Sequence, residues 1–310
     1  MEHRLDNPSA RHSSLLPSGN GSGSKELQTQ RVFFANLVAS AAGAPKNERL
    51  ISAFANTPRE KYLGPGPWRI FAGGNLLETP SSDPAYLYQD VVVAIAPDRG
   101  INNGQPVLHA VCLAGLAIQP GETIVHIGAG TGYYTAILAQ LTGPDGHVDA
   151  YEIEEDLAAR AAANLSEFAN ITVYHRNATQ APLPPCDVIY VNAGATSPLD
   201  LWLDALRRKG RLLFPLTPDH GPGGAPGHGA MLLVTRNTDS AETFAAHFLT
   251  LAMFIPCIGA RDEATAAKLA ESFKRGDARN VRSLRRNSSP DQSSWCAGAN
   301  WWLSSADPPQ

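Results

Sequence analysis

Cysteine is scarce in this chain of 310 residues, and the few that occur form no metal-type group. The four cysteines are far apart in the sequence, at Cys112, Cys186, Cys257 and Cys296. This spacing excludes a small disulfide-stapled domain and a zinc site built from paired cysteines. No set of histidine, cysteine and acidic residues has ligand spacing either, so we expect no metal. The thiols are predicted to be buried or incidental, in a reducing compartment.

Long hydrophobic runs and an excess of basic charge are also missing. The most apolar run in the second half, residues 244–258, contains His247 and Pro256 and is too short to span a bilayer. Residues 1–24 hold no apolar core of signal-peptide length. Lysine plus arginine number 25 against 29 acidic residues, which gives a net charge of −4 and no general attraction to nucleic acid. We expect a cytoplasmic protein, acting as a monomer, with no nucleic-acid or membrane partner.

What the chain does contain divides it into three parts. Residues 1–25 are polar and rich in glycine and serine, which predicts a disordered extension. Residues 26–260 are predicted to form one domain, with N-terminal helices and a loop region in 26–120 and a core in 121–260. Residues 261–310 are predicted to form a C-terminal extension with a charged helix. Its basic residues suit a contact with RNA or an acidic partner, and its acidic residues favour a solvated helix face.

The most informative stretch spans residues 121–152. Residues 123–127 are mostly apolar and β-branched, typical of a buried strand, and three glycines lead from them into a helix. These glycines are Gly128, Gly130 and Gly132. A second strand, residues 147–151, ends at Glu152, where nucleotide folds place an acid that binds ribose hydroxyls. This order predicts an adenosine-type cofactor, the alternative being a glycine-rich turn beside an unrelated surface acid.

Beyond Glu152, strand and helix patterns alternate, which is typical of a doubly wound α/β sheet. Five further strands are predicted, at residues 171–175, 187–191, 211–216, 231–235 and 247–255. Helices are predicted at residues 157–168, 198–208 and 262–284, with a Gly/Pro-dense connection at 217–229. The expected fold is a Rossmann-like, mostly parallel sheet of seven strands with an antiparallel closing strand.

The glycine spacing distinguishes between cofactors. A dinucleotide fingerprint has the form GxGxxG, whereas here the form GxGxG is followed by Tyr133. That form resembles the glycine motif of class I S-adenosylmethionine-dependent methyltransferases, so S-adenosylmethionine is the expected cofactor. Because this ligand has no pyrophosphate, the loop only has to let backbone pass close to it.

Several motifs, in order between residues 32 and 259, narrow the resemblance to one family. They are Pro58-Arg59-Glu60, Tyr88-Gln89-Asp90, Gly104-Gln105-Pro106, residues 125–135, Tyr151-Glu152, residues 209–215 and residues 254–259. Together they are similar to those of protein-L-isoaspartate O-methyltransferase, which transfers a methyl group from S-adenosylmethionine to a carboxylate of damaged aspartyl residues. The resemblance implies protein or peptide substrates with isoaspartyl residues. It also implies catalysis mainly by positioning, because a carboxylate is already a nucleophile at neutral pH.

The resemblance implies which residues form the site. On the methyl-acceptor side it implies Asn103, Gly104 and Gln105, in the loop before a helix at residues 106–118. At the cofactor it implies His126, Gly128, Ala129, Gly130, Thr131, Gly132, Glu152 and Asn177.

Three positions depart from the family pattern. Gly104 stands where the family has a serine, so a hydroxyl donor is lost unless Asn102, Asn103 or backbone amides replace it. His126 stands where an acid meets the cofactor's amino group, and the alternative is a core histidine satisfied by backbone. Asn177 replaces an aspartate at the adenine, where its carbonyl can still accept a hydrogen bond. Two alternatives stay open: a methyltransferase with another acceptor, and a non-catalytic binding module.

Overall fold

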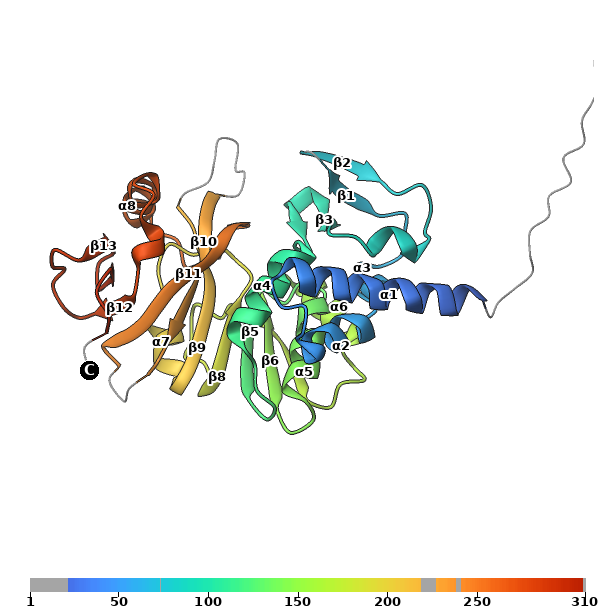
Figure 1. Ribbon diagram of the computed structural model, residues 1–310, viewed down its shortest axis with the longest axis horizontal. Helices are drawn as coiled ribbons and strands as arrows, with labels where there is room; N and C mark the ends of the chain where they lie inside the picture. Colours follow the sequence, from blue (N-terminus) through green and yellow to red (C-terminus); the bar gives the residue numbers. More distant parts are fainter. Residues whose placement is uncertain (1–21, 73, 219–226, 238–240, 309–310) are drawn as a thin grey trace, which may run out of the picture.

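A large sheet runs through the computed structural model, which describes residues 22–72, 74–218, 227–237 and 241–308 (Figure 1). Within these residues the chain forms two sheets. The large sheet has ten strands in the order β13-β14-β12-β11-β10-β9-β8-β5-β6-β7, and the small sheet has four in the order β2-β1-β3-β4. Hydrophobic cores lie on both faces of the large sheet, which is the layered architecture of doubly wound α/β domains.

Seven strands of the large sheet correspond to the predicted ones. They are β5 (Thr123–Ile127), β6 (His147–Glu152), β7 (Ile171–His175), β8 (Cys186–Val191), β9 (Leu206–Leu216), β10 (Gly227–Thr235) and β11 (Thr243–Phe254). Strands β5 to β9 pair in parallel, whereas β10 is antiparallel to both of its neighbours, β9 and β11. The predicted Rossmann-like, mostly parallel sheet with an antiparallel closing strand is therefore confirmed.

Alternate side chains of the parallel strands fill two cores. Ile124 and Tyr190 pack in the core that contains residues of α1 (Ser22–Ala41), α2 (Glu48–Asn56), α4 (Pro106–Leu116), α5 (Tyr133–Thr142) and α6 (Glu155–Asn164). Val125 and Ile189 pack in the other core, with Trp202 of α7 (Asp200–Ala205). Because both faces are covered, the sequences of these strands read as continuous apolar runs rather than alternating ones.

The small sheet orders a region that the sequence predicts only as a loop with short extended pieces. It consists of β1 (Arg69–Ala72), β2 (Asn75–Glu78), β3 (Val92–Ala96) and β4 (Ile101–Asn102). The helix α3 (Arg59–Leu63) precedes it, the turn η1 (Pro84–Leu87) lies between β2 and β3, and the turn η2 (Pro97–Arg99) lies between β3 and β4. It lies beside α1 and above it in Figure 1. Residues 101–106 lead from this sheet directly into α4, so its position sets the position of that loop.

Several predicted boundaries are wrong, each for a local reason. Disorder was expected through residue 25, but α1 begins at Ser22; residues 1–21 lie outside the described residues. The helix expected at 157–168 ends at Asn164, whose side-chain amide donates to the Thr131 carbonyl at 2.9 Å. The helix expected at 198–208 ends at Ala205, because the next residue already pairs with β8. In the Gly/Pro-dense connection, residues 219–226 lie outside the described residues.

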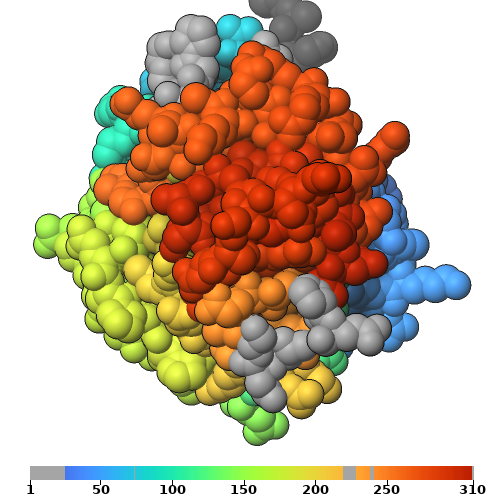
Figure 2. Space-filling view, turned by 90° about the vertical axis from the view of Figure 1, so that its left-hand side faces the viewer, coloured from blue at the N-terminus to red at the C-terminus, as the bar shows by residue number. Residues whose placement is uncertain are grey.

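The C-terminal extension differs most from its prediction. In place of one helix over 262–284, the chain forms α8 (Glu263–Lys274), η4 (Ala278–Asn280) and β12 (Ser283–Arg286). Gly276, at φ 75°, adopts a left-handed conformation that ends the helix. Strands β13 (Ser294–Ala297) and β14 (Trp301–Ser304), which were not predicted, continue the large sheet through β12. These C-terminal residues form a broad face of the molecule in Figure 2.

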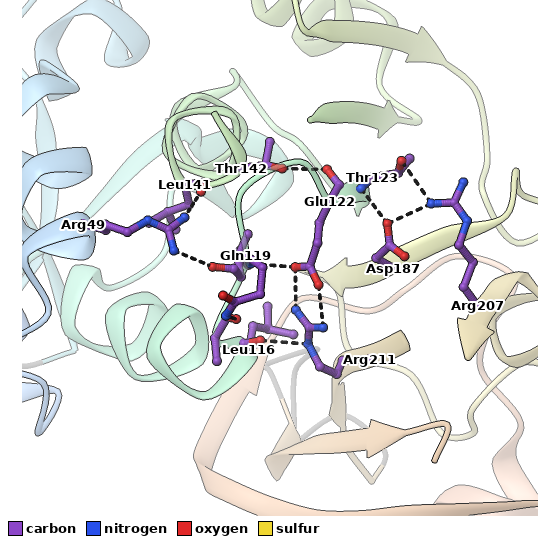
Figure 3. Close-up of polar contacts among 12 residues, drawn as sticks. Arg49, Leu116, Gln119, Glu122, Thr123, Leu141, Thr142, Asp187, Arg207 and Arg211 are labelled. Carbon is purple, nitrogen blue, oxygen red and sulfur yellow. Dashed lines mark hydrogen bonds and ion pairs between the residues drawn. The ribbon is translucent and has the colours of Figure 1, made fainter. Parts of the chain in front are cut away.

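The amino-terminal edge of the large sheet, where β5, β8 and β9 begin, carries a network of paired charges (Figure 3). Arg211 donates two hydrogen bonds to the Glu122 carboxylate, at 2.8 and 2.7 Å, and a third to the Leu116 carbonyl at 2.9 Å. Beside this pair, Arg207 donates to Asp187 Oδ2 at 2.8 Å. Both partners of the Arg211–Glu122 pair are mostly buried, with side-chain exposures of 17% and 15%. This edge is therefore held by charge-assisted, bidentate bonds.

Candidate functional site

The glycine loop lies at the opposite, carboxyl-terminal edge of the large sheet, between β5 and α5. Its three glycines have φ angles of 79° (Gly128), 56° (Gly130) and 95° (Gly132), which are left-handed conformations that favour glycine. A Cβ at Gly132 would lie 2.7 Å from the Leu165 side chain, whereas one at Gly130 would find its nearest neighbour, in Ile95, at 3.5 Å. The middle of the loop therefore presents bare backbone, while its end packs tightly against the protein.

Glu152 is the acid at the end of β6, and the structure fixes its carboxylate against the glycine loop. It is 6% exposed and accepts backbone N–H groups from Gly130 at 2.7 Å, Ile153 at 2.8 Å and Glu154 at 3.0 Å. Burial raises the pKa of Glu152, and the three N–H groups oppose that shift. With three hydrogen bonds on about four lone-pair sites, the carboxylate keeps limited capacity for ligand hydroxyls.

Asn177 lies two residues beyond the end of β7, on the same edge. Its Oδ1 atom accepts from the Thr179 backbone N–H at 3.0 Å and from the Thr179 hydroxyl at 2.8 Å. Its Nδ2 atom donates to the Ile258 carbonyl at 3.4 Å. The carbonyl oxygen expected to receive the adenine amino group is thus already used within the protein, so that contact requires one of the Thr179 bonds to give way.

His126 lies in β5 with its ring buried under the loop, fully shielded from solvent. Its Nδ1 atom is 2.9 Å from the Thr135 hydroxyl, and its Nε2 atom is 2.7 Å from the Asn192 Nδ2 atom. Burial lowers the pKa of His126 to about 3, so the ring is neutral. Because both nitrogens have side-chain partners, His126 has no free atom for a ligand. The direct cofactor contact predicted for it would require one of these two contacts, with Thr135 or with Asn192, to break.

Asn192 was missed by the sequence analysis. It is the first residue after β8, its backbone N–H donates to the Ile127 carbonyl at 2.8 Å, and its Cβ would lie 3.6 Å from a Cβ on Gly128. Its Oδ1 atom is buried and accepts no hydrogen bond from the described residues. The signal that could have found it is positional: β5 has β6 on one side and β8 on the other, which is the switch point where open α/β sheets bind ligands.

The loop at residues 102–106 approaches this edge from the small sheet. Asn102 Oδ1 accepts the Gly104 N–H at 2.9 Å, so that amide is not free for a ligand. Asn103 is 8% exposed and uses Oδ1 to accept the Val93 N–H at 3.1 Å, while its Nδ2 atom is buried with no acceptor among the described residues. Asp90 accepts from Gln105 Nε2 at 2.7 Å and from a backbone N–H in the first turn of α4.

His109 explains the glycine at position 104. A Cβ on Gly104 would lie 2.2 Å from His109 Nε2, and Gly104 has φ 71°, so a serine there would force the ring to move. The ring stacks on Tyr134 at 3.5 Å between centroids, and its Nδ1 atom is 2.7 Å from the Tyr190 hydroxyl. Burial lowers the pKa of His109 well below its usual value.

This edge offers half-buried glycine backbone, one fixed carboxylate, and an amide acceptor and an amide donor that have no partner among the described residues. Such a set suits an uncharged adenosine group with a flexible polar tail. A sequence model of the family described as "Protein-L-isoaspartate(D-aspartate) O-methyltransferase" matches residues 77–257, more than half of the chain. The chain belongs to this family. The match includes strands β3 and β4 of the small sheet, the loop at 102–106 and all seven predicted strands up to the end of β11, and the family predicted from the sequence is confirmed.

Two protein-L-isoaspartate O-methyltransferases are similar in sequence to about 70% of this chain, in agreement with the family model. A protein-L-isoaspartate O-methyltransferase of Rhodopseudomonas palustris is 29% identical over 224 residues, which cover 71% of this chain and 89% of the relative. One of Methanothermobacter thermautotrophicus is 28% identical over 221 residues, covering 70% of this chain and 90% of the relative. The methyltransferase relatives are therefore matched over nearly their whole length.

Solved structures agree on the fold. One is a putative protein-L-isoaspartate O-methyltransferase of Plasmodium falciparum in complex with S-adenosyl-L-homocysteine. It has a TM-score of 0.58 at 19% identity and covers 74% of this chain and 98% of its own. A second protein-L-isoaspartate O-methyltransferase has a TM-score of 0.59 and covers 80% of this chain. Residues 258–310 lie beyond the family-model match.

Proposed function

We propose that this protein is an S-adenosylmethionine-dependent protein-L-isoaspartate O-methyltransferase, which methylates carboxylates of damaged aspartyl residues in proteins or peptides. Family membership supports the reaction, and the carboxyl-terminal edge supports the ligands. The observation that carries the proposal is the pairing of a glycine cradle beside a fixed carboxylate, Glu152, with a loop that holds a buried, unpaired amide donor, Asn103 Nδ2. The first suits a nucleoside, and the second suits a carboxylate.

The residues at the edge fit S-adenosylmethionine. In this proposal the loop Gly128–Gly132 would pass under the methionine and ribose, Glu152 would accept from the ribose hydroxyls, and Asn177 would face the adenine. The fit rests on the bare backbone at Gly130, where the nearest neighbour of an added Cβ would be Ile95 at 3.5 Å, and on the buried acceptor Asn192 Oδ1, which requires a donor that the described residues do not provide. When bound, the cofactor supplies an electrophilic methyl group.

On the acceptor side, the protein has only to bind and orient a nucleophile. A carboxyl group with a pKa near 4 is already ionised at neutral pH, so no general base is needed. Asn103 Nδ2 would donate to the substrate carboxylate, and Gln105, whose amide is held by Asp90, would fix the loop around it. Precise placement of an existing nucleophile accounts for large rate gains by itself.

The test is transfer of labelled methyl from S-adenosylmethionine to a synthetic isoaspartyl peptide and to its aspartyl twin, with calorimetry of S-adenosylhomocysteine on the same sample. The proposal expects label on the isoaspartyl peptide only. Asn103→Ala should reduce transfer while S-adenosylhomocysteine still binds, and Asn56→Ala, on the exposed end of α2, is the control. If the cofactor binds but neither peptide is labelled, the proposed isoaspartyl substrate is refuted, whereas the assignment as a methyltransferase stands.

A second candidate keeps the cofactor and changes the methyl acceptor. It is favoured by one observation: the His109 ring fills the space that a side chain at position 104 would need. A pocket altered in this way suits a peptide or small molecule with a differently placed carboxylate. Competition between the isoaspartyl peptide and other carboxylate acceptors, scored as initial rates, separates the two candidates.

The finer expectations on partners remain proposals. We propose that the protein acts as a monomer in the cytoplasm and binds no nucleic acid. The basic residues of the C-terminal extension support the last point, because Arg286 pairs with Asp200 and Asp204, and Arg285 pairs with Asp291. Among the described residues, no helix has both the length and the apolar character needed to cross a membrane. Size-exclusion chromatography and an RNA-binding assay are the measurements.

A further inference from the structure

The buried side-chain oxygen of Asn192 receives no hydrogen bond from the described residues, and a buried acceptor without a donor is destabilising. A buried acceptor left unpaired destabilises a folded protein, and such groups usually find a partner in the protein, a water or a ligand. Asn192 Oδ1 has none among the described residues, although the other atom of the same amide lies 2.7 Å from His126 Nε2. The amide is thus fixed on one side and open on the other.

The environment of His126 determines which atom of the amide is open. A neutral histidine carries one N–H, and its other nitrogen accepts. With the proton on Nδ1, the ring donates to the Thr135 hydroxyl at 2.9 Å and Nε2 accepts from Asn192 Nδ2. The ring also stacks on Tyr190 at 5.6 Å between centroids, with an interplanar angle of 11°. Held in this way, the histidine keeps the amide N–H₂ on itself and turns the oxygen toward the switch point.

The order of the strands indicates which part of the cofactor meets that oxygen. Along the carboxyl-terminal edge the sequence of positions is Asn177 after β7, Glu152 at the end of β6, the glycine loop after β5 and Asn192 after β8. Neighbouring strands are about 4.8 Å apart, so this row spans about 14 Å. With adenine and ribose at the first two positions, the methionine end reaches the last. Its α-ammonium group is the hydrogen-bond donor at that end.

We infer that Asn192 Oδ1 accepts a hydrogen bond from the α-ammonium group of S-adenosylmethionine, and that His126 is the positioning residue that orients the Asn192 amide for it. The inference rests on the cofactor named in the proposed function and is independent of the methyl acceptor. In this inference His126 affects cofactor binding through Asn192 and does not contact the cofactor itself.

The test compares two ligands by calorimetry: S-adenosylhomocysteine and its deamino analogue, which lacks the α-amino group. Asn192→Leu should weaken binding of S-adenosylhomocysteine roughly 10- to 100-fold, the range for losing a hydrogen bond to a charged group, and leave the analogue nearly unchanged. Asn192→Asp, which keeps an acceptor, should retain affinity for S-adenosylhomocysteine. Asn56→Leu, on the exposed end of α2, is the matched control and should change neither.

A cycle of His126→Phe, Asn192→Leu and the double variant tests the positioning role. If His126 acts through Asn192, the double variant should bind S-adenosylhomocysteine no more weakly than Asn192→Leu alone. Equal losses for both ligands in Asn192→Leu, or no loss, would overturn the inference while the proposed function stands. Wild-type protein that binds neither ligand would overturn both. Transfer to the isoaspartyl peptide, measured separately, reports on the acceptor alone.

Discussion

The amino-terminal and carboxyl-terminal edges of the large sheet differ in how completely their polar side chains are paired. At the amino-terminal edge, Arg211 and Glu122 meet in a bidentate pair, and the neighbouring carbonyls and carboxylates are also bonded (Figure 3). At the carboxyl-terminal edge, Asn192 Oδ1 and Asn103 Nδ2 are buried and find no partner in the part of the chain that the structure describes, and Glu152 accepts three backbone N–H groups.

This difference teaches where the fold keeps its unpaired polar groups. Parallel strands bring one set of ends to each edge, so a doubly wound sheet can stabilise one edge and bind ligands at the other. Unpaired buried groups lower stability, and they persist where a ligand completes them. The comparison therefore predicts that substitutions at the amino-terminal edge lower stability, and that those at the carboxyl-terminal edge lower affinity.

The largest expected effect is on stability, from Arg211→Ala. It leaves the mostly buried Glu122 carboxylate without its cation, which should lower the free energy of unfolding by about 3 kcal/mol. Chemical denaturation measures it. The matched control is Arg207→Ala, which breaks the pair with Asp187 where the arginine is 47% exposed and should cost under about 1 kcal/mol. Equal costs for the two variants would remove the contrast between buried and surface pairs at this edge.

Next in size is the effect of Glu152→Gln on affinity. The substitution keeps the size of the side chain and removes its charge, so S-adenosylhomocysteine should bind roughly 10-fold to 100-fold more weakly. Glu155→Gln, on an exposed residue in the first turn of α6, is the control and should bind normally. Calorimetry gives both dissociation constants. Unchanged affinity in Glu152→Gln would mean that the acid only braces the glycine loop.

Per pH unit, a smaller effect follows from the buried, neutral ring of His126. Burial holds the pKa of His126 at about 3, whereas an unfolded histidine has a pKa of about 6.5. Between these values the unfolded state binds more protons, so stability falls as pH falls from 6.5 toward 3. The slope is about 1 kcal/mol per pH unit for one histidine. Denaturation of wild type and His126→Phe at several pH values should show a shallower slope in the variant; parallel slopes would refute it.

The same comparison shows what the sequence could predict. The glycine loop and Glu152 were found because a strand, three positive-φ glycines and an acid follow one another locally, and each has its own chemical signature. All seven strands of the predicted sheet were found because strands buried on both faces are continuous apolar runs. These patterns involve residues that are close together in the sequence, so they can be recognised without knowledge of the tertiary structure.

The residues that were missed depend on contacts distant in sequence. Asn192 lies next to His126 because β8 pairs with β5. The two residues are 66 positions apart in the sequence, but Asn192 Nδ2 is 2.7 Å from His126 Nε2. From the sequence, Gly104 is only a position where the family's serine is absent. The structure shows that the His109 ring occupies the space that a side chain at position 104 would need. Strands β12 to β14 are short, and the tryptophans of β13 and β14 indicate burial without saying which sheet these strands join. Pairing of this kind is tertiary information.

The smallest predicted effect tests whether an ion pair near the site serves stability or function. Arg99, on the small sheet, makes a bidentate pair with Asp156 at 2.8 and 2.7 Å and also contacts Glu154, whose backbone N–H holds the Glu152 carboxylate. Because the pair is exposed, Arg99→Ala should leave the melting temperature nearly unchanged. Affinity for S-adenosylhomocysteine should fall roughly 2- to 5-fold, since the Glu152 turn loses its brace.

Lys274→Ala, which breaks a more exposed pair with Glu271 in α8, is the control and should alter neither quantity. A fall in melting temperature with normal affinity in Arg99→Ala would place Arg99 with Arg211, as a structural clamp. The two edges of the sheet would then not separate stability from ligand binding, because an exposed ion pair at the carboxyl-terminal edge would be stabilising the fold. A change in affinity alone assigns Arg99 to the site, through the turn that carries Glu152.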